Sequence, residues 1–261
     1  MHSFELVKPK TLADAVAALA DGAQALSGGQ TLLPTMKQRL ADPGTLVSLT
    51  GIPELQGVCQ GDAGIIIGGA TPHAVVAREA AKYYPGLAAL AGQIGDPAVR
   101  NRGTIGGSIA NNDPSACYPA AVLGSGATIV TNTREIAADD YFLGMFETAL
   151  EEGEIVTAVK FPVPQKAAYA KFVQPASRFA LVGAFVAQFA DGVRVAITGA
   201  SNNGVFRWPE AEAALSASFT PEALKGLTLP ADDMIADLHG SAEYRAHLCG
   251  VMTKRAVMAA G

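Results

Sequence analysis

Two glycine pairs, each flanked by hydroxyl side chains, constrain this chain more than any other feature of its sequence. One pair belongs to residues 103–108, Gly-Thr-Ile-Gly-Gly-Ser, inside a polar stretch at residues 96–119. Glycines let main-chain N–H groups approach an anion with no Cβ in the way, and successive N–H groups in a tight turn form an anion-binding concavity. Arg100 and Arg102 add positive charge beside it. By itself, such a segment is more often a solvated surface loop.

The other pair lies upstream, in residues 27–34, Ser-Gly-Gly-Gln-Thr-Leu-Leu-Pro. It follows a short apolar stretch, residues 23–26, which we expect to be a strand, and it precedes a helix predicted over residues 32–40. At such strand–turn–helix junctions, free N–H groups and the helix dipole favour an anion. Two loops of this kind predict a ligand with two linked phosphates, held from both sides.

The familiar nucleotide signatures do not fit either loop. A Walker loop needs a lysine after its glycines, and neither loop has one. The best match to the dinucleotide fingerprint G-x-G-x-x-G, residues 124–129, has Ile129 in place of the third glycine. The sequence therefore argues against an ATP or nicotinamide site of the usual kinds.

Length and composition predict a folded protein of two or three modest domains. The chain has 261 residues, 49% of them hydrophobic and 16% charged. Its net charge of −5 argues against a nucleic-acid or anionic-membrane partner. No apolar run approaches the ~18 residues that a membrane-spanning helix needs, and the first residues lack the layout of a signal peptide. Three sparse cysteines indicate a reducing compartment, so we expect a cytoplasmic protein.

Hydrophobic periodicity divides the chain into three units. The first alternates strands and helices to about residue 54; Thr11 is predicted to cap its first helix, which ends at Asp21-Gly22. In the second unit, Thr71 is expected to cap a helix whose first position is Pro72. The third unit begins around residues 165–168 and combines an antiparallel meander with helices. Its strands are predicted at residues 168–173, 180–189 and 193–199.

No residue is predicted to be catalytic or to bind a metal. His73 lies alone at a predicted helix start, where a polar surface or capping role is expected. His247 and Cys249 are two residues apart on one helix, so they do not share a face. No Cys-x-x-Cys pair occurs, and we expect no zinc or iron–sulfur cluster on the chain itself.

Together, the two glycine loops resemble the flavin-diphosphate loops of the FAD-binding medium subunits of molybdenum hydroxylases. That family includes aerobic carbon monoxide dehydrogenase and bacterial xanthine dehydrogenase. The resemblance covers nearly the whole chain. It extends to Phe-Glu-Leu at residues 4–6, Ile-Gly-Asp-Pro at 94–97, Arg-Asn-Arg-Gly at 100–103 and Ala-Glu-Tyr-Arg at 242–245.

The resemblance implies an α+β fold of two domains. Residues 1–165 would form a two-subdomain FAD-binding domain of the PCMH type, divided at about residues 54 and 55. Residues 166–261 would form a domain like the C-terminal domain of the carbon monoxide dehydrogenase flavoprotein, with a three-stranded antiparallel sheet and helices.

The resemblance also implies a function as an electron-transfer subunit. A large molybdenum-cofactor subunit would oxidise the substrate, and a small iron–sulfur subunit would pass the electrons to FAD on this chain, within a dimer of heterotrimers. The flavin would hand them to an external acceptor, because in flavoproteins the cofactor carries the redox chemistry. The alternative is a relative that has lost its flavin and serves only as a scaffold.

The residues that the resemblance assigns to FAD come from both loops and the segment that follows the second. They are Ser27, Gly28, Gly29, Gln30, Thr31, Leu32, Thr104, Ile105, Gly106, Gly107, Ser108, Asn112, Asp113 and Cys117. Many relatives carry an acidic residue two positions before the proline that corresponds to Pro119, where this chain has Cys117. A thiol is a weak donor and a weaker acceptor. Either Asp113 or main-chain groups replace that contact, or the flavin is held less tightly.

Overall fold

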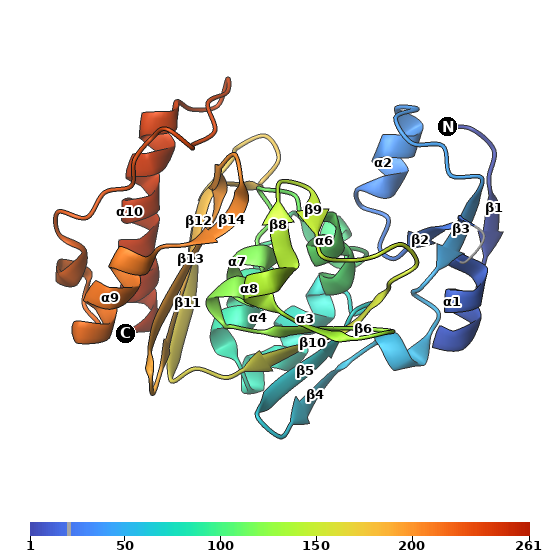
Figure 1. Cartoon of the computed structure of the whole chain (residues 1–261), viewed down its shortest axis with the longest axis horizontal. Coiled ribbons are helices and arrows are strands. Elements are labelled where there is room, and N and C mark those ends of the chain that lie inside the picture. The colour runs from blue at the N-terminus through green and yellow to red at the C-terminus, as the bar shows by residue number, and fades with distance from the viewer. Residues whose placement is uncertain (20–21) are drawn as a thin grey trace.

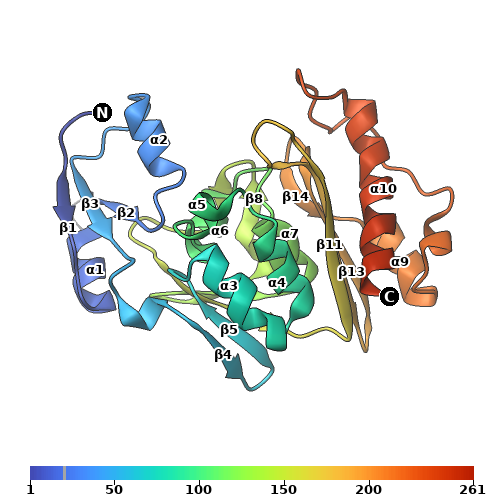
Figure 2. The ribbon, with the colours of Figure 1, turned by 180° about the vertical axis from the view of Figure 1, so that it is seen from behind.

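A computed structural model describes residues 1–19 and 22–261 of the chain, which form three units arranged side by side (Figures 1 and 2). The N-terminal unit is a three-stranded parallel sheet of order β1-β3-β2 with two helices. Its elements are β1 (Glu5–Val7), α1 (Leu12–Leu19), β2 (Gln24–Leu26), α2 (Leu32–Lys37) and β3 (Thr45–Ser48). The Asp14 N–H donates to the Thr11 hydroxyl over 3.1 Å, which confirms the predicted cap. Asp21, where that helix was predicted to end, lies outside the described residues.

The middle unit is a five-stranded antiparallel sheet of order β4-β5-β10-β6-β7, packed against helices. Its strands are β4 (Val58–Gly61), β5 (Gly64–Gly68), β6 (Thr128–Thr131), β7 (Glu135–Ala137) and β10 (Val156–Pro162). Its helices are α3 (His73–Glu79), α4 (Pro85–Gly92), α5 (Pro97–Arg100), α6 (Ile105–Asn111), α7 (Tyr118–Gly124) and α8 (Ala138–Tyr141). A small hairpin, β8 (Phe142–Gly144) and β9 (Glu147–Thr148), lies beside them. Residues of this sheet and of α4, α6 and α7 form the largest buried cluster.

The predicted cap at Thr71 is wrong. Helix α3 begins at His73, one residue later than expected, and Pro72 is its N-cap residue. The Thr71 side chain is fully buried, and its hydroxyl accepts from the Gly57 N–H at 2.9 Å and donates to the Gly57 carbonyl at 3.2 Å. A buried hydroxyl needs partners, and a neighbouring chain segment supplies them here.

The C-terminal unit is a sheet of four antiparallel strands, where three were predicted. It consists of β11 (Lys166–Val173), β12 (Ala180–Phe189), β13 (Gly192–Ser201) and β14 (Gly204–Arg207), with helices α9 (Pro209–Ala217) and α10 (Ala242–Ala260). Short 3-10 turns occur at Pro53–Leu55, Ala80–Lys82 and Pro221–Leu224. The missed strand, β14, is four residues long and follows β13 through a tight turn, so its sequence carries little periodicity.

The central strands of this sheet are covered on both faces. Successive side chains of a strand point to opposite faces. Phe185 and Ala187 of β12 therefore pack with the middle unit, whereas Ala184 and Val186 pack with α9 and α10. This double burial makes β12 a continuous apolar run and joins the middle and C-terminal units through one shared sheet.

Helix α10 is fastened to the sheet by a buried arginine. Arg245 is 3% exposed, and its Nη1 donates to the carbonyls of Leu181 and Gly199, each over 2.7 Å. Its Nη2 donates to an Asp237 carboxylate oxygen at 2.7 Å.

We predict that Arg245→Met lowers the free energy of unfolding by about 3 kcal/mol, because two buried carbonyls lose their donor and Asp237 loses its partner. Urea denaturation followed by circular dichroism measures this. The matched control is Arg255→Met on the exposed side of the same helix, where a change within about 0.5 kcal/mol is expected. Equal effects of the two substitutions would contradict a fastening role for Arg245.

Candidate functional site

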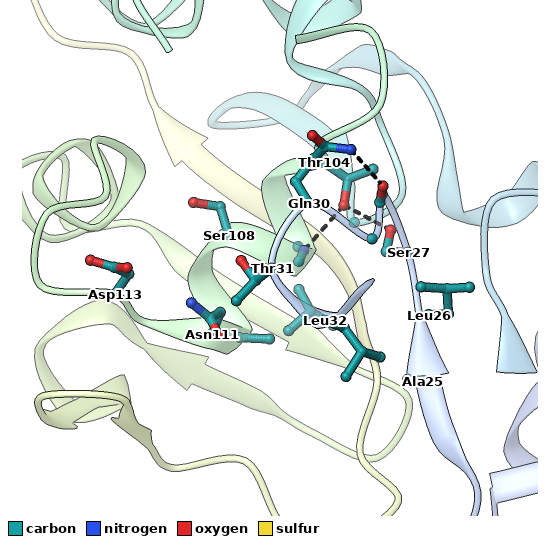
Figure 3. A pocket seen from close by; sticks show the side chains of 18 of the residues that line it. Ala25, Leu26, Ser27, Gln30, Thr31, Leu32, Thr104, Ser108, Asn111 and Asp113 are labelled. Atoms are coloured by element: carbon teal, nitrogen blue, oxygen red, sulfur yellow. Dashed lines mark hydrogen bonds between the residues drawn. The ribbon is translucent and has the colours of Figure 1, made fainter. Parts of the chain in front are cut away.

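A cavity of about 840 Å³ lies where the three units meet. Its wall combines β2 and the loop after it, helix α6, Thr148 with residues 150–156, and Lys171 with the β11–β12 loop residues 177–179. In the view of Figure 3, Thr31 and Ser108 lie between Asp113 on one side and Leu26 on the other. The cavity is large enough for a dinucleotide, because ligand sites in proteins commonly span about 300–1,000 Å³.

The glycines of the two loops allow main chain to pack directly on main chain. A Cβ at Gly28 would lie 2.6 Å from Gly103 Cα and closer still to the Arg102 carbonyl oxygen. A Cβ at Gly106 would lie 2.6 Å from the carbonyl oxygen of Gly69. The prediction that these glycines clear the path of a phosphate is therefore wrong for Gly28 and Gly106. Their missing side chains make room for neighbouring backbone.

A pair of hydroxyls joins the two loops. Ser27 Oγ and Thr104 Oγ1 are 2.7 Å apart, and Thr104 Oγ1 also accepts from the Gly107 N–H at 3.2 Å as the N-cap of α6 (Figure 3). Because one threonine caps the helix and contacts the other loop, the loops form a single rigid surface.

The first loop carries the free main-chain donors. The N–H groups of residues 28–32 have no hydrogen-bond partner among the residues that the structure describes. In the second loop, the Ile105 N–H donates to the Thr71 carbonyl at 3.2 Å and the Gly106 N–H to the Gly69 carbonyl at 2.8 Å. The prediction of free N–H groups on both sides is therefore wrong for the second loop, although its Ser108 lines the cavity. A run of unpaired N–H groups at the start of α2 is the kind of surface that binds phosphate oxygens.

The structure brings most of the predicted site residues to this cavity. Those that line it are Ser27, Gly28, Gly29, Gln30, Thr31, Leu32, Thr104, Gly106, Gly107, Ser108, Asp113 and Cys117. Two do not. Ile105 is fully buried in the core of the middle unit. Asn112 ends α6 in the left-handed conformation, and its Nδ2 donates to the carbonyls of Gly144 and Glu147 at 2.8 and 2.9 Å.

The positive charge on the wall comes from residues that the sequence did not single out. Arg100 donates to the carbonyls of Ile94 and Gly95, each at 3.0 Å. Neither Arg100 nor Arg102 is among the lining residues, whereas Lys171 and Arg178 are. These two follow the second loop by more than sixty positions in the sequence, so no local pattern links them to the site.

His73 is buried, contrary to the predicted surface or capping role. It is 4% exposed, lies at the cavity wall and packs at 5.2 Å between ring centroids against Tyr118. Burial, aided by the charge of Arg100, lowers the pKa of His73 to about 4. The imidazole is therefore neutral near neutral pH.

Glu154 holds the wall segment of residues 148–156 in place. Its side chain is almost fully buried and accepts from the Arg134 guanidinium and from the Glu151 N–H. The Arg134 hydrogen bond is the main reason that the pKa of Glu154 falls to about 2. This carboxylate therefore stays ionised and fixes the loop throughout the usual pH range.

Comparison with known proteins identifies the family. Residues 2–164 match the family described as the FAD binding domain in molybdopterin dehydrogenase. The chain belongs to this family. It is 34% identical to the carbon monoxide dehydrogenase medium chain of Hydrogenophaga pseudoflava, over 98% of this chain and 96% of that one. It is 33% identical to the nicotine 6-hydroxylase medium subunit of Paenarthrobacter nicotinovorans, over 100% and 98%.

The family resemblance extends to solved structures. The reconstituted carbon monoxide dehydrogenase from Oligotropha carboxidovorans matches with a TM-score of 0.89 and 33% identity, covering 99% of this chain and 98% of that one. The predicted family, the α+β fold class, the oxidoreductase assignment and FAD as the cofactor are confirmed. The chain is thus an FAD-binding medium subunit of the molybdenum hydroxylase type.

No helix in the described ranges is both long and apolar enough to cross a membrane. Within residues 1–19 and 22–261, no group of three or more His, Cys, Asp or Glu side chains is placed to hold a metal ion.

We predict that His73 makes the folded state sensitive to mild acid. Its pKa is about 4 in the folded chain and about 6.5 in the unfolded one, so between these values only the unfolded state takes up the proton. The contribution of His73 to the free energy of unfolding is therefore fully present above about pH 6.5 and decreases as pH falls. The decrease is about 2 kcal/mol between about pH 6.5 and about pH 5. Urea denaturation across this range should give a flatter profile for His73→Gln. His239→Gln, at an exposed histidine, should keep the original slope.

Proposed function

We propose that this chain is the FAD-carrying electron-transfer subunit of a molybdenum hydroxylase of the carbon monoxide dehydrogenase or xanthine dehydrogenase type. It would receive electrons from the iron–sulfur clusters of a partner subunit and pass them through FAD to an external acceptor. One observation carries the proposal: residues 28–32, whose N–H groups are unpaired among the described residues, line a dinucleotide-sized cavity in a member of an FAD-binding family.

The residues of the cavity fit FAD in their chemistry. The N–H groups of residues 28–32, with the hydroxyls of Thr31 and Ser108, would bind the diphosphate at the middle of the cavity. Leu32, Ile94 and Phe179 offer apolar surface to the flat rings on either side. Bound FAD supplies both one-electron and two-electron transfer. The chain's own part is to bind and orient the cofactor and to keep water from it.

We propose the following arrangement for the assembly. A large molybdenum-cofactor subunit and a small iron–sulfur subunit join this chain in a dimer of heterotrimers. Two relatives are named medium chain and medium subunit, and these names support the proposal that the chain assembles with a large and a small subunit. Residues 1–165 form the FAD-binding domain and residues 166–261 the C-terminal domain. The three free cysteines fit the cytoplasm, a reducing compartment.

We predict that Gly107→Val weakens FAD binding at least tenfold while leaving the fold intact. A Cβ at Gly107 meets only Thr104 Oγ1 at 3.0 Å and Ser27 Cβ at 3.6 Å, so the added methyls project into the cavity beside the proposed diphosphate. Titration of the apoprotein with FAD, followed by flavin fluorescence, measures the loss. Gly92→Val, at a glycine whose Cβ has open space, is the control and should keep full affinity. Undiminished binding by Gly107→Val would place the diphosphate elsewhere.

The electron-relay function predicts dependence on partners. Purified alone, the chain should be yellow, contain FAD but no molybdenum or iron, and show no flavin bleaching with carbon monoxide, purines or N-heterocycles under anaerobic conditions. Mixed with the cognate large and small subunits, it should show substrate-dependent loss of the flavin absorbance band. Bleaching in the isolated chain would make it a self-sufficient enzyme. A colourless protein that binds no added FAD but still assembles would identify a flavin-less scaffold.

A further inference from the structure

Lys171 is the partly buried cation on the wall of the cavity. It projects from β11, and its Nζ donates to the carbonyls of Gln93 and Arg178, each at 2.8 Å. Its third polar contact is Cys117 Sγ at 3.6 Å. An ammonium group has three donors, so these contacts use all of them and hold the charge at one point.

No carboxylate neutralises this charge. Among the described residues, no Asp or Glu oxygen lies within ion-pair distance of Lys171 Nζ. The side chain that meets it inside the cavity wall is that of Cys117, which is 5% exposed. Asp113, the carboxyl at this end of the cavity, accepts instead from the Ser115 N–H at 2.8 Å. Lys171 therefore places a fixed positive charge on the wall with no carboxylate oxygen within ion-pair distance of it, although Asp113, Glu151, Glu152 and Glu154 line other parts of the cavity.

The end of the cavity near Asp113 and Lys171 suits the flavin ring of FAD, which is the part of the cofactor whose charge changes on reduction. Asp113 and Leu26 lie on opposite sides of Thr31 and Ser108 in Figure 3. With the diphosphate at Thr31 and Ser108, one half of the cofactor would extend towards Asp113 and the other towards Leu26. Asp113 and Cys117 belong to one turn that precedes α7, and the half-exposed Phe179 adds apolar surface there. Both basic side chains of the described wall, Lys171 and Arg178, come from the neighbouring β11–β12 segment.

We propose that Lys171, which has no carboxylate partner among the described residues, raises the reduction potential of the FAD held in this cavity. The proposal rests on the proposed function. Reduction adds two electrons, supplied by the iron–sulfur donor, and one proton from solvent, so the cofactor gains one negative charge. A fixed cation in a medium of low dielectric constant stabilises that charge more than the oxidised form. The chain thus binds reduced FAD more tightly than oxidised FAD, and this ratio of affinities sets the shift in potential.

The first test removes the cation. The potential of bound FAD is measured by anaerobic equilibration with a dye of known potential, using the flavin absorbance band. Lys171→Met should lower the affinity ratio about tenfold, which is a fall of about 30 mV for a two-electron couple. Lys171→Arg keeps the charge and should stay close to the unaltered protein. Lys166→Met, at an exposed lysine of the same strand, should not change the potential.

The second test keeps Lys171 and compensates its positive charge with a carboxylate. Cys117→Asp places a carboxylate beside the ammonium and should lower the potential as Lys171→Met does, whereas Cys117→Ser should not. If Lys171→Met fails to retain FAD because the β11–β12 loop has lost the hydrogen bond from Lys171 to the Arg178 carbonyl, the potential of Cys117→Asp tests the proposal. An unchanged potential in Cys117→Asp, or in an FAD-loaded Lys171→Met, overturns this proposal alone. Absence of FAD from the unaltered protein overturns the proposed function with it.

Discussion

The candidate site depends on the direct contact of two backbone segments. Gly28 lies against residues 102 and 103, and Gly106 lies against Gly69, with no side chain between them in either case. The hydroxyls of Ser27 and Thr104 then join the loops across this contact. Because the N–H groups of Ile105 and Gly106 donate to carbonyls of the segment that follows β5, the second loop serves as the support on which the first loop presents free donors.

The cavity forms where the three units pack against one another, and each unit contributes part of its wall. The N-terminal unit contributes the donors of residues 28–32, the middle unit contributes α6 and residues 148–156, and the C-terminal sheet contributes Lys171 and Phe179. The double burial of β12 fixes the C-terminal sheet against α4 and α7. Charge at the wall is therefore positioned by the packing of this sheet against the middle unit, and changes in that packing are expected to reach the cavity.

Polar side chains at this site divide into those that hold the walls and those that face the ligand. Glu154 and Asn112 hold loops by hydrogen bonds that leave them little capacity for a ligand. His73 is neutral and packed, which suits a wall more than a proton carrier. Lys171 does both. Its ammonium group contacts three segments of the wall, at Gln93, Cys117 and Arg178, and its charge remains at the cavity.

The sequence alone determined the ligand class, the order of most strands and helices, and the two glycine loops that line the cavity, because glycine pairs, caps and periodicity are local properties. Only the tertiary structure decided why Gly28 and Gly106 must be glycine and that His73 is buried. It also decided that the Thr71 hydroxyl forms hydrogen bonds with the main chain of Gly57, and which charge faces the cavity. Arg100 is adjacent to a loop in sequence but turns to nearby carbonyls, whereas Lys171 arrives from a strand of another sheet. Burial and contact across long separations depend on how the sheets pack, and no local pattern encodes that.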